Sequence, residues 1–219
     1  MWAADDDSWE PSFVSCLVEA LESNPDAVLA FCRFDFVSVD KQPIICRNKW
    51  SKISGRSVFY RLLFFHTYNP LVSNAYYIYG LMRKDILLKC GGVETRVDPY
   101  SSTDIVLLFH LLCYGRFITV DKLLHHHSLG PGRTESLSQR LARKSLYSLA
   151  TNYFKWLNTW HQHFHILRVI VKETSMKSPP KIILLTMLYM KELVFYFDNL
   201  IRTFIRYVLN RPHDILNRT

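Results

Sequence analysis

The chain has 219 residues, of which 49% are hydrophobic, and it carries a formal net charge of +8 at pH 7. This length favours one domain with an appended helical piece, and the apolar content allows a full core. About 18 uninterrupted apolar residues occur nowhere, and the acidic start lacks a basic and then apolar leader, so we expect neither a transmembrane span nor a secretory signal. The positive charge favours anionic partners.

The first part of the chain alternates predicted helices and strands. Apolar residues at helical spacing predict helices over 11–23, 58–66, 83–90 and 103–114. Runs of strand-forming residues predict strands over 27–39, 44–46, 75–79 and 117–120. The first two strands form a predicted hairpin, and Gly91 and Gly92 are expected to cap the third helix in a left-handed conformation. This alternation indicates an α/β fold.

After a predicted loop over 125–133, only helices are expected, over 136–160 and 182–209 with a further segment to residue 172. The last helix is rich in aromatic residues, and Arg202 and Arg206 lie four apart on one face. This combination suits a helix lying on a membrane surface, while packing on the domain or on a second subunit is the alternative. His161, His163 and His165 scatter around a helix, which favours a surface or membrane-interface position.

Three adjacent carboxylates, Asp5, Asp6 and Asp7, precede the first predicted helix. Like charges held close together are costly unless a cation neutralises them. Mg²⁺ or Mn²⁺ prefers one or two carboxylates together with phosphate oxygens, so one interpretation is a metal site that holds a phosphorylated substrate. The alternative is simpler: Asp7 or Ser8 caps the helix and Asp6 interacts with its dipole.

Four stretches in order resemble the family-2 glycosyltransferases of GT-A fold. They are Ala4-Asp-Asp-Asp-Ser-Trp-Glu-Pro-Ser-Phe13, Asn74-Ala-Tyr-Tyr-Ile-Tyr-Gly-Leu-Met-Arg83 with Leu87 and Gly91-Gly92, Ser102-Thr-Asp-Ile-Val-Leu-Leu108 with Gly115-Arg-Phe117, and His125-His-His-Ser-Leu-Gly-Pro-Gly-Arg-Thr-Glu-Ser136. They are similar to the family's DXD region, the segment before the acceptor loop, the helix with the catalytic base and the closing loop. The resemblance implies a partial, Rossmann-like GT-A domain over 1–137 and a helical extension over 138–219.

The resemblance also implies roles for individual residues. Asp5, Asp6 and Asp7 match the motif that binds Mg²⁺ or Mn²⁺ on the diphosphate of a nucleotide-sugar. One of His125, His126 and His127 matches a late residue that reaches the metal or the pyrophosphate, with His127 as the expected metal ligand. Asp104 matches the general base that deprotonates the acceptor hydroxyl, or it caps its helix. His126 and Arg133 are implied phosphate partners. The three histidines otherwise form a basic turn.

The chain departs from the family pattern at two places. Thr103 stands where the family has an acidic residue before the base. Family members also carry about 80 to 100 residues before the DXD motif, which bind the nucleoside. We therefore expect this chain to be the C-terminal portion, lacking most of the nucleotide-binding half.

The resemblance implies metal-dependent, inverting transfer of a sugar from a nucleotide-diphospho-sugar to a glycan or lipid-linked acceptor, in glycan or cell-envelope polysaccharide synthesis. Five scattered cysteines without a CxxC pair are typical of a reducing compartment, so the expected location is cytoplasmic. The aromatic C-terminal helix and the family's lipid-linked acceptors add a peripheral position on the inner face of the cell membrane as a further option. The alternatives are a non-catalytic module that binds a membrane or partner, and a metal-dependent phosphohydrolase. Nucleic-acid binding ranks last because the basic residues are dispersed, and a homo-oligomer stays open.

Overall fold

The computed structural model describes residues 1–37, 43–44, 55, 57–67, 74–92, 103–128 and 146–209. Its strands are β1 (Ser8–Trp9), β2 (Ala27–Val37), β3 (Pro43–Ile44), β4 (Leu81–Met82) and β5 (Arg116–Ser128). Its helices are α1 (Phe13–Glu22), α2 (Val58–Thr67), the 3-10 helix η2 (Asn74–Tyr79), α3 (Lys84–Lys89), α4 (Thr103–Tyr114), α6 (Leu146–Glu173) and α7 (Ser178–Leu209). The expected mixture of helices and strands is confirmed.

The strands form one mixed sheet in the order β1-β5-β2-β3, with β4 also pairing with β2. The two long strands, β2 and β5, are parallel, whereas the three short strands pair in antiparallel fashion at the edges. The pairing of β2 with β3 agrees with the predicted hairpin. The parallel pair forms the centre of the sheet, and its side chains project from both faces.

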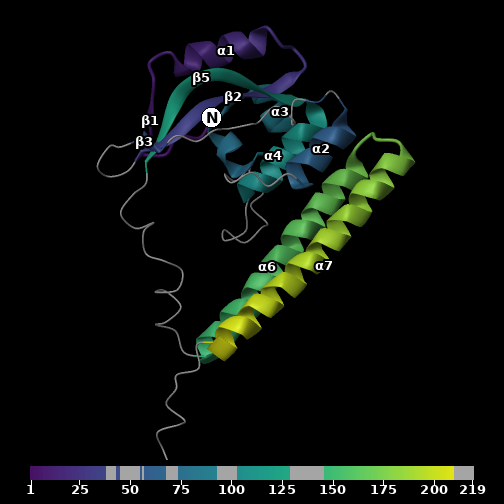
Figure 1. Ribbon diagram of the computed structural model, residues 1–219. Coiled ribbons are helices and arrows are strands. Elements are labelled where there is room, and N and C mark those ends of the chain that lie inside the picture. Colours follow the sequence, from purple (N-terminus) through teal and green to yellow (C-terminus); the bar gives the residue numbers. More distant parts are fainter. Residues whose placement is uncertain are drawn as a thin grey trace, which may run out of the picture.

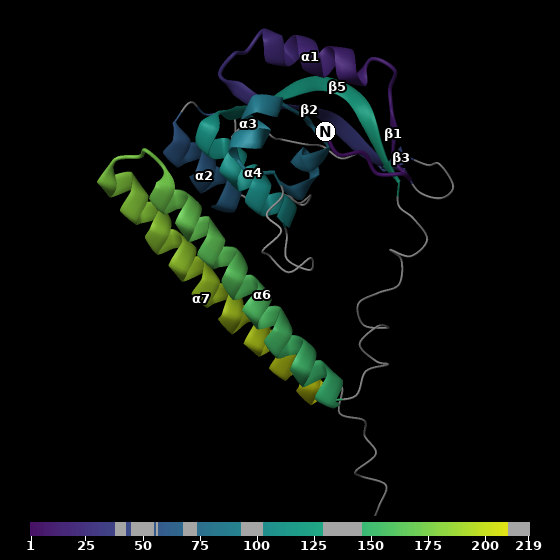
Figure 2. The same ribbon diagram turned by 180° about the vertical axis from the view of Figure 1, so that it is seen from behind.

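Helices cover both faces of this sheet (Figures 1 and 2). On one face α1 buries Phe13, Leu17 and Leu21 against Ala30 and Cys32 of β2. The other face packs against α4, α2 and η2, and their buried side chains form the larger core. Leu62 and Phe65 of α2 and Leu108 and Leu112 of α4 belong to it. Successive side chains of β2 and β5 point to opposite faces of the sheet, so these strands contribute to a hydrophobic layer on each side.

Two predicted elements of the α/β part differ from the structure. The expected strand over 75–79 is a 3-10 helix, in which the buried ring of Tyr77 packs on Phe31 and Phe117 of the sheet. Aromatic residues favour strands only where sheet partners are present, and here tertiary packing takes precedence. The strand expected over 117–120 extends to Ser128, because its second half continues to pair with β2. The predicted loop at 125–128 is therefore wrong.

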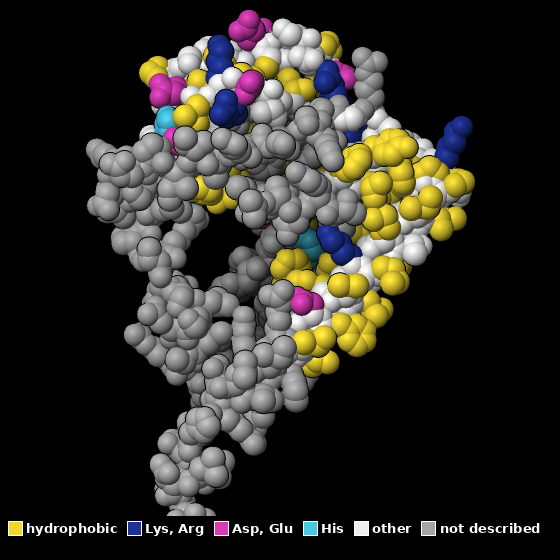
Figure 3. All heavy atoms as spheres, in the orientation of Figure 1, with side chains coloured by type: hydrophobic (Ala, Val, Ile, Leu, Met, Phe, Trp, Pro, Cys, Tyr) yellow, Lys and Arg dark blue, Asp and Glu magenta, His cyan; other side chains and the backbone are white. Residues whose placement is uncertain are grey.

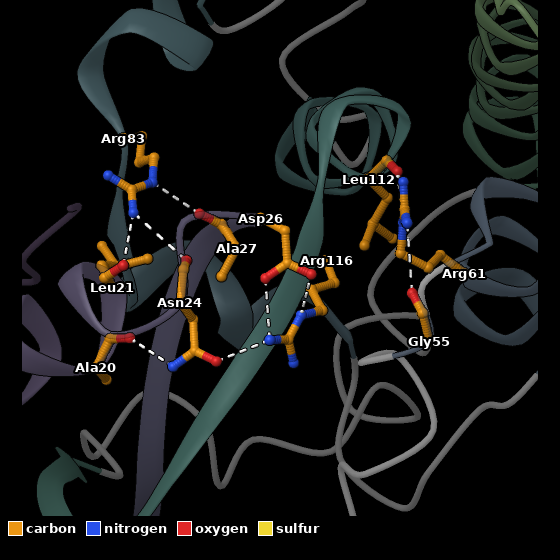
Figure 4. Close-up of polar contacts among 10 residues, drawn as sticks. All are labelled: Ala20, Leu21, Asn24, Asp26, Ala27, Gly55, Arg61, Arg83, Leu112 and Arg116. Atoms are coloured by element: carbon orange, nitrogen blue, oxygen red, sulfur yellow. Dashed lines mark hydrogen bonds and ion pairs between the residues drawn. The ribbon is translucent and has the colours of Figure 1, made fainter.

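Two arginines, Arg83 and Arg116, form polar contacts with the segment that connects α1 to β2 (Figure 4). Nε of Arg83 donates to the carbonyl of Ala27 at 2.8 Å, and its Nη2 donates to that of Leu21 at 2.6 Å. Arg116 at the start of β5 forms an ion pair with Asp26 at 2.8 Å. Arg83 thus contacts backbone carbonyls of the α1–β2 connection.

The predicted left-handed cap of α3 is confirmed, since Gly91 and Gly92 both have φ of +73°.

The C-terminal helices α6 and α7 form a long hairpin beside the α/β part (Figure 1). α6 is continuous through the His161–His165 run, and α7 begins at Ser178, earlier than predicted. The side chain of Glu192 on α7 is buried and accepts hydrogen bonds from Arg168, from Nδ1 of His161 at 2.8 Å and from Tyr196 at 3.0 Å. This polar cluster links the two helices of the hairpin.

One histidine of the hairpin contradicts its predicted surface position. His163 is only 2% exposed and packs against Trp160 and Phe164, whereas His161 and His165 are exposed. Helical spacing places these alternating histidines on different faces, and one of those faces is turned toward the core. Within the described residues, no helix combines the length and apolarity needed to cross a bilayer.

Candidate metal centre

Three side chains from distant parts of the chain converge at one end of the sheet. Oδ2 of Asp7 lies 3.0 Å from Nε2 of His125 and 2.9 Å from Nδ1 of His127. The backbone N–H of Ser128 donates to Oδ1 of the same carboxylate at 3.0 Å. One ligand atom from each of the three residues lies within 4.8 Å of the other two. No other group of three such residues meets this criterion in the part of the chain that the structure describes.

Strand geometry explains why the histidines separate into two faces. Successive side chains of a strand point to opposite sides, so His125 and His127 share a face and His126 points away from it. The antiparallel register of β1 with β5 pairs Ser8 with His126 and Trp9 with His125, which brings the preceding Asp7 next to His127. The short strand β1 is therefore the element that delivers Asp7 to the histidines.

The cluster is enclosed by aromatic rings. The side chains of Asp7, His125 and His127 are 0%, 0% and 3% exposed. Trp9 stacks on His125 at 5.5 Å between ring centroids with an interplanar angle of 4°, and Tyr76 meets His127 edge-on at 5.1 Å. Tyr79 contacts both imidazoles. These rings exclude water and strengthen the electrostatic interactions among the three polar groups.

The charge states follow from this environment. Burial alone would raise the pKa of Asp7, but hydrogen bonds with His127, His125 and the N–H of Ser128 outweigh it and lower the pKa. Burial lowers the pKa of His125, and the hydrogen bond with Asp7 offsets this only in part. The arrangement at neutral pH is thus an ionised carboxylate beside a neutral His125. Nδ1 of that imidazole is buried without a hydrogen-bond partner.

His126 makes a separate cluster on the opposite face. Its Nδ1 lies 2.7 Å from Oδ1 of Asp35, and its Nε2 lies 3.2 Å from Oε1 of Glu10. Burial would lower the pKa of His126, yet its hydrogen bonds to the two carboxylates raise it. Both ring nitrogens of His126, a predicted phosphate contact, lie within hydrogen-bond distance of a carboxylate.

Asp5, Asp6 and Asp104 are not members of this cluster. Asp5 and Asp6 are exposed, which leaves Asp7 as the member of the triplet that reaches the histidines. Asp104 is half-buried at the start of α4, where its Oδ1 accepts the N–H of Ile105 at 2.8 Å. Burial raises the pKa of Asp104, and this hydrogen bond counteracts the rise in part. Arg133 lies outside the described residues.

The placement of Asp104 follows from chain reversal. Gly115 alone connects α4 to β5, and a Cβ at this position would meet the carbonyl oxygen of Asp26 at 2.7 Å. The reversal turns the start of α4 toward the same end of the sheet as the C-terminal half of β5 (Figure 2). Ligand sites of parallel α/β sheets form at the carboxyl ends of the strands.

The donor set fits a divalent transition ion better than Mg²⁺. Two imidazole nitrogens and one carboxylate are ligands of first-row transition metals, whereas Mg²⁺ prefers oxygen atoms and retained waters. The sequence leaves open which of His125, His126 and His127 reaches the metal, because a predicted loop does not sort side chains onto faces. The structure brings His125 and His127 together with Asp7. The sequence gives no clear signal for this extension of the strand, because Asp121 and Lys122 interrupt the apolar residues of 117–124.

Comparison with known proteins assigns neither a family nor a function to this chain. The chain matches no protein-family model and no curated protein. The chemistry of the cluster therefore carries the functional argument.

Proposed function

We propose that this chain is the metal-binding and acceptor-side portion of a glycosyltransferase that moves a sugar from a nucleotide-diphospho-sugar to an acceptor hydroxyl. The observation that carries this proposal is the convergence of Asp7 with His125 and His127. The aspartate run and the histidine run lie more than a hundred residues apart in sequence. They are the two stretches to which the family resemblance assigns metal binding.

In this proposal Asp7 and His127 hold a divalent cation, with His125 as a third ligand. The cation supplies positive charge that stabilises the leaving diphosphate. The resemblance implies Mg²⁺ or Mn²⁺, and of these two Mn²⁺ binds nitrogen ligands more tightly and Mg²⁺ gives up its waters more reluctantly, so we propose Mn²⁺. The aromatic rings of Tyr76 and Tyr79 keep the imidazoles in place and limit access of water to them.

Asp104 is the proposed general base. Its raised pKa brings the carboxylate closer to the range in which it accepts a proton from a hydroxyl at neutral pH. Its position at the start of α4, toward the carboxyl ends of the parallel strands, supports the same role. Direct attack by the deprotonated acceptor hydroxyl would invert the anomeric carbon.

The first test is calorimetry of the full chain with Mn²⁺ or Mg²⁺ alone, and then with UDP-, GDP- and dTDP-sugars in the presence of each metal. We expect Mn²⁺ to bind more tightly than Mg²⁺ and to be required for one class of donor. Asp7→Asn should abolish metal binding. The exposed neighbour Asp6→Asn is the matched control and should bind like the wild type. Donor binding that survives in Asp7→Asn would refute the proposed site.

A second test separates donor binding from transfer. Asp104→Asn keeps the shape of the side chain but cannot accept a proton. We expect donor binding to stay within a factor of about two and transfer to an acceptor to fall about 100-fold or more, the usual contribution of a general base. Equal loss of binding and transfer would assign Asp104 to helix capping.

One observation favours a second candidate, a structural metal site in a non-catalytic module. The three side chains are at most 3% exposed, so the cluster resembles a closed site more than one open to a substrate. This candidate predicts that Mn²⁺ or Zn²⁺ raises the melting temperature while no nucleotide-sugar binds. Metal binding with donor binding would exclude it.

A further inference from the structure

α7 is apolar on two sides, and only one of them is covered. Leu184 and Leu188 are buried in the core that α7 shares with α6 and the α/β part. The other side carries nine apolar residues that are each 50–61% exposed, here called the outer stripe: Ile182, Ile183, Tyr189, Met190, Leu193, Val194, Phe197, Leu200 and Ile201. Figure 3 shows hydrophobic side chains gathered along this face of the hairpin.

The outer stripe is continuous and uncharged. At 3.6 residues per turn its nine positions fall within an arc of about 140°. Lys191, Glu192 and Asp198 are the charged residues of this part of α7, and their positions fall outside the arc. An apolar face of this width is typical of a helix packed against another element, and a helix apolar on all sides is normally buried.

The spacing within the stripe favours another helix as the partner. Ile183, Met190, Leu193, Phe197 and Leu200 follow a repeat of three and four residues, interrupted only by Thr186. This repeat gives the seam along which two helices interlock side chains. The α6–α7 hairpin already shows that α7 packs lengthwise against a helix.

A lipid surface fits the stripe less well. Helices that lie on membranes carry basic residues along the border of the apolar face. Nζ of Lys181 instead donates to the carbonyls of Thr174 at 2.7 Å and Lys172 at 3.1 Å in the turn of the hairpin. Lys191 is half-buried, and burial lowers its pKa. In the part of α7 whose side chains are described, no basic border follows the stripe.

We propose that the outer stripe is the interface with a second copy of this chain. Nine half-exposed side chains would bury on the order of 900 Å² per copy, close to the area of a standard stable interface. The stripe begins with Ile182 and Ile183, ends with Leu200 and Ile201, and has Met190 and Leu193 on either side of its midpoint. A two-fold axis at that midpoint pairs the apolar residues of the stripe with one another, except that Phe197 faces Thr186 of the second copy.

The pairing is antiparallel, with Met190 against Leu193 of the second copy and Ile183 against its Leu200. The α/β part packs beside one end of the hairpin (Figure 1), so antiparallel packing keeps the two α/β parts apart. The four helices of the two hairpins then form one bundle, with α7 of each copy in its centre. This inference does not depend on the metal site or on glycosyl transfer.

The test is the mass of the full chain in solution, measured by light scattering after gel filtration over the micromolar range. We expect twice the 25.8 kDa of one chain for the wild type. Leu193→Glu places two charges at the centre of the interface and should weaken the dimer about 30-fold or more. Leu88→Glu on α3 is the matched control, since Leu88 is 69% exposed outside the stripe, and should remain dimeric.

Two results would overturn the proposal. One is a monomeric wild type, whatever the variants do, and the other is a folded Leu193→Glu that stays fully dimeric. Far-UV circular dichroism checks the fold, and Leu193→Thr replaces Leu193→Glu if the latter unfolds. Sedimentation with phosphatidylcholine–phosphatidylglycerol vesicles distinguishes the lipid alternative: a monomer that binds vesicles through Leu193 would also refute the dimer.

Discussion

Among single residues, Asp7 is the one whose substitution we expect to lower the stability of the fold most. Its side chain is fully buried, and it accepts hydrogen bonds from two imidazoles and one backbone N–H. Removal of one partner from a buried charged network leaves the remaining groups without compensation. The three consecutive aspartates therefore differ sharply in their contribution, although they are identical in sequence.

Asp7→Asn is expected to lower the free energy of unfolding by about 2–3 kcal/mol at pH 7 in metal-free buffer. The lowered pKa of Asp7 means that its contribution is present above the ordinary pKa of 3.8 and is lost as the pH falls through the folded-state value. The deficit of the variant should therefore shrink in acid. Urea denaturation at several pH values measures it.

Asp6→Asn provides the comparison, because Asp6 is exposed. A surface substitution of this kind changes stability by less than about 0.5 kcal/mol. Equal stability of Asp7→Asn and Asp6→Asn would mean that the carboxylate–imidazole contacts do not hold β1 on β5.

At the scale of elements, burial decides the behaviour of the α6–α7 hairpin. His163 sits between Trp160 and Phe164, and its Nδ1 has no hydrogen-bond partner. Burial lowers the pKa of His163 to about 4. The unfolded chain, with an ordinary pKa of about 6.5, therefore binds more protons between these values, and stability falls as the pH drops through this window.

His163→Leu is expected to remove this pH dependence, because leucine has a similar volume and does not titrate. At pH 5 the wild type should have lost about 2 kcal/mol relative to pH 8 through this residue, and the variant should not. Thermal unfolding followed at both pH values gives the difference. His165→Leu, exposed on the same helix, should keep the wild-type profile; an unchanged profile in His163→Leu would contradict the assignment.

At the scale of the whole molecule, one apolar core joins the two predicted parts. Leu62, Leu108 and Phe117 of the α/β part belong to the same buried cluster as Leu167 and Leu184 of the hairpin. The core thus runs across the boundary predicted at residue 137. Because each part covers apolar surface of the other, we expect them to unfold together.

Leu167→Ala tests this cooperation, since Leu167 is fully buried between the hairpin and the α/β part. We expect a loss of about 2–4 kcal/mol and a single transition that is superimposable by circular dichroism and tryptophan fluorescence. Leu88→Ala at an exposed position should have little effect. Two separate transitions, with only one of them shifted by Leu167→Ala, would show that the hairpin folds independently.

Secondary structure could be predicted from the residues alone where periodicity and capping agree. The helices at 58–67 and 103–114, the glycine cap of α3 and the long strand at 27–37 were all predictable, because their signals lie within a few neighbouring residues. The aspartate and histidine runs could also be named as candidate ligands, since their chemistry is visible without a fold.

Which of these residues come into contact depends on the packing of the folded chain. β5 continues through His125–Ser128 because β2 offers it a pairing partner, and only that strand puts His125 and His127 on one face with Asp7. The 3-10 helix at 74–79 and the burial of His163 likewise depend on rings that lie far away in sequence. Long-range pairing and burial are properties of the packed molecule, so no local pattern of residues could specify them.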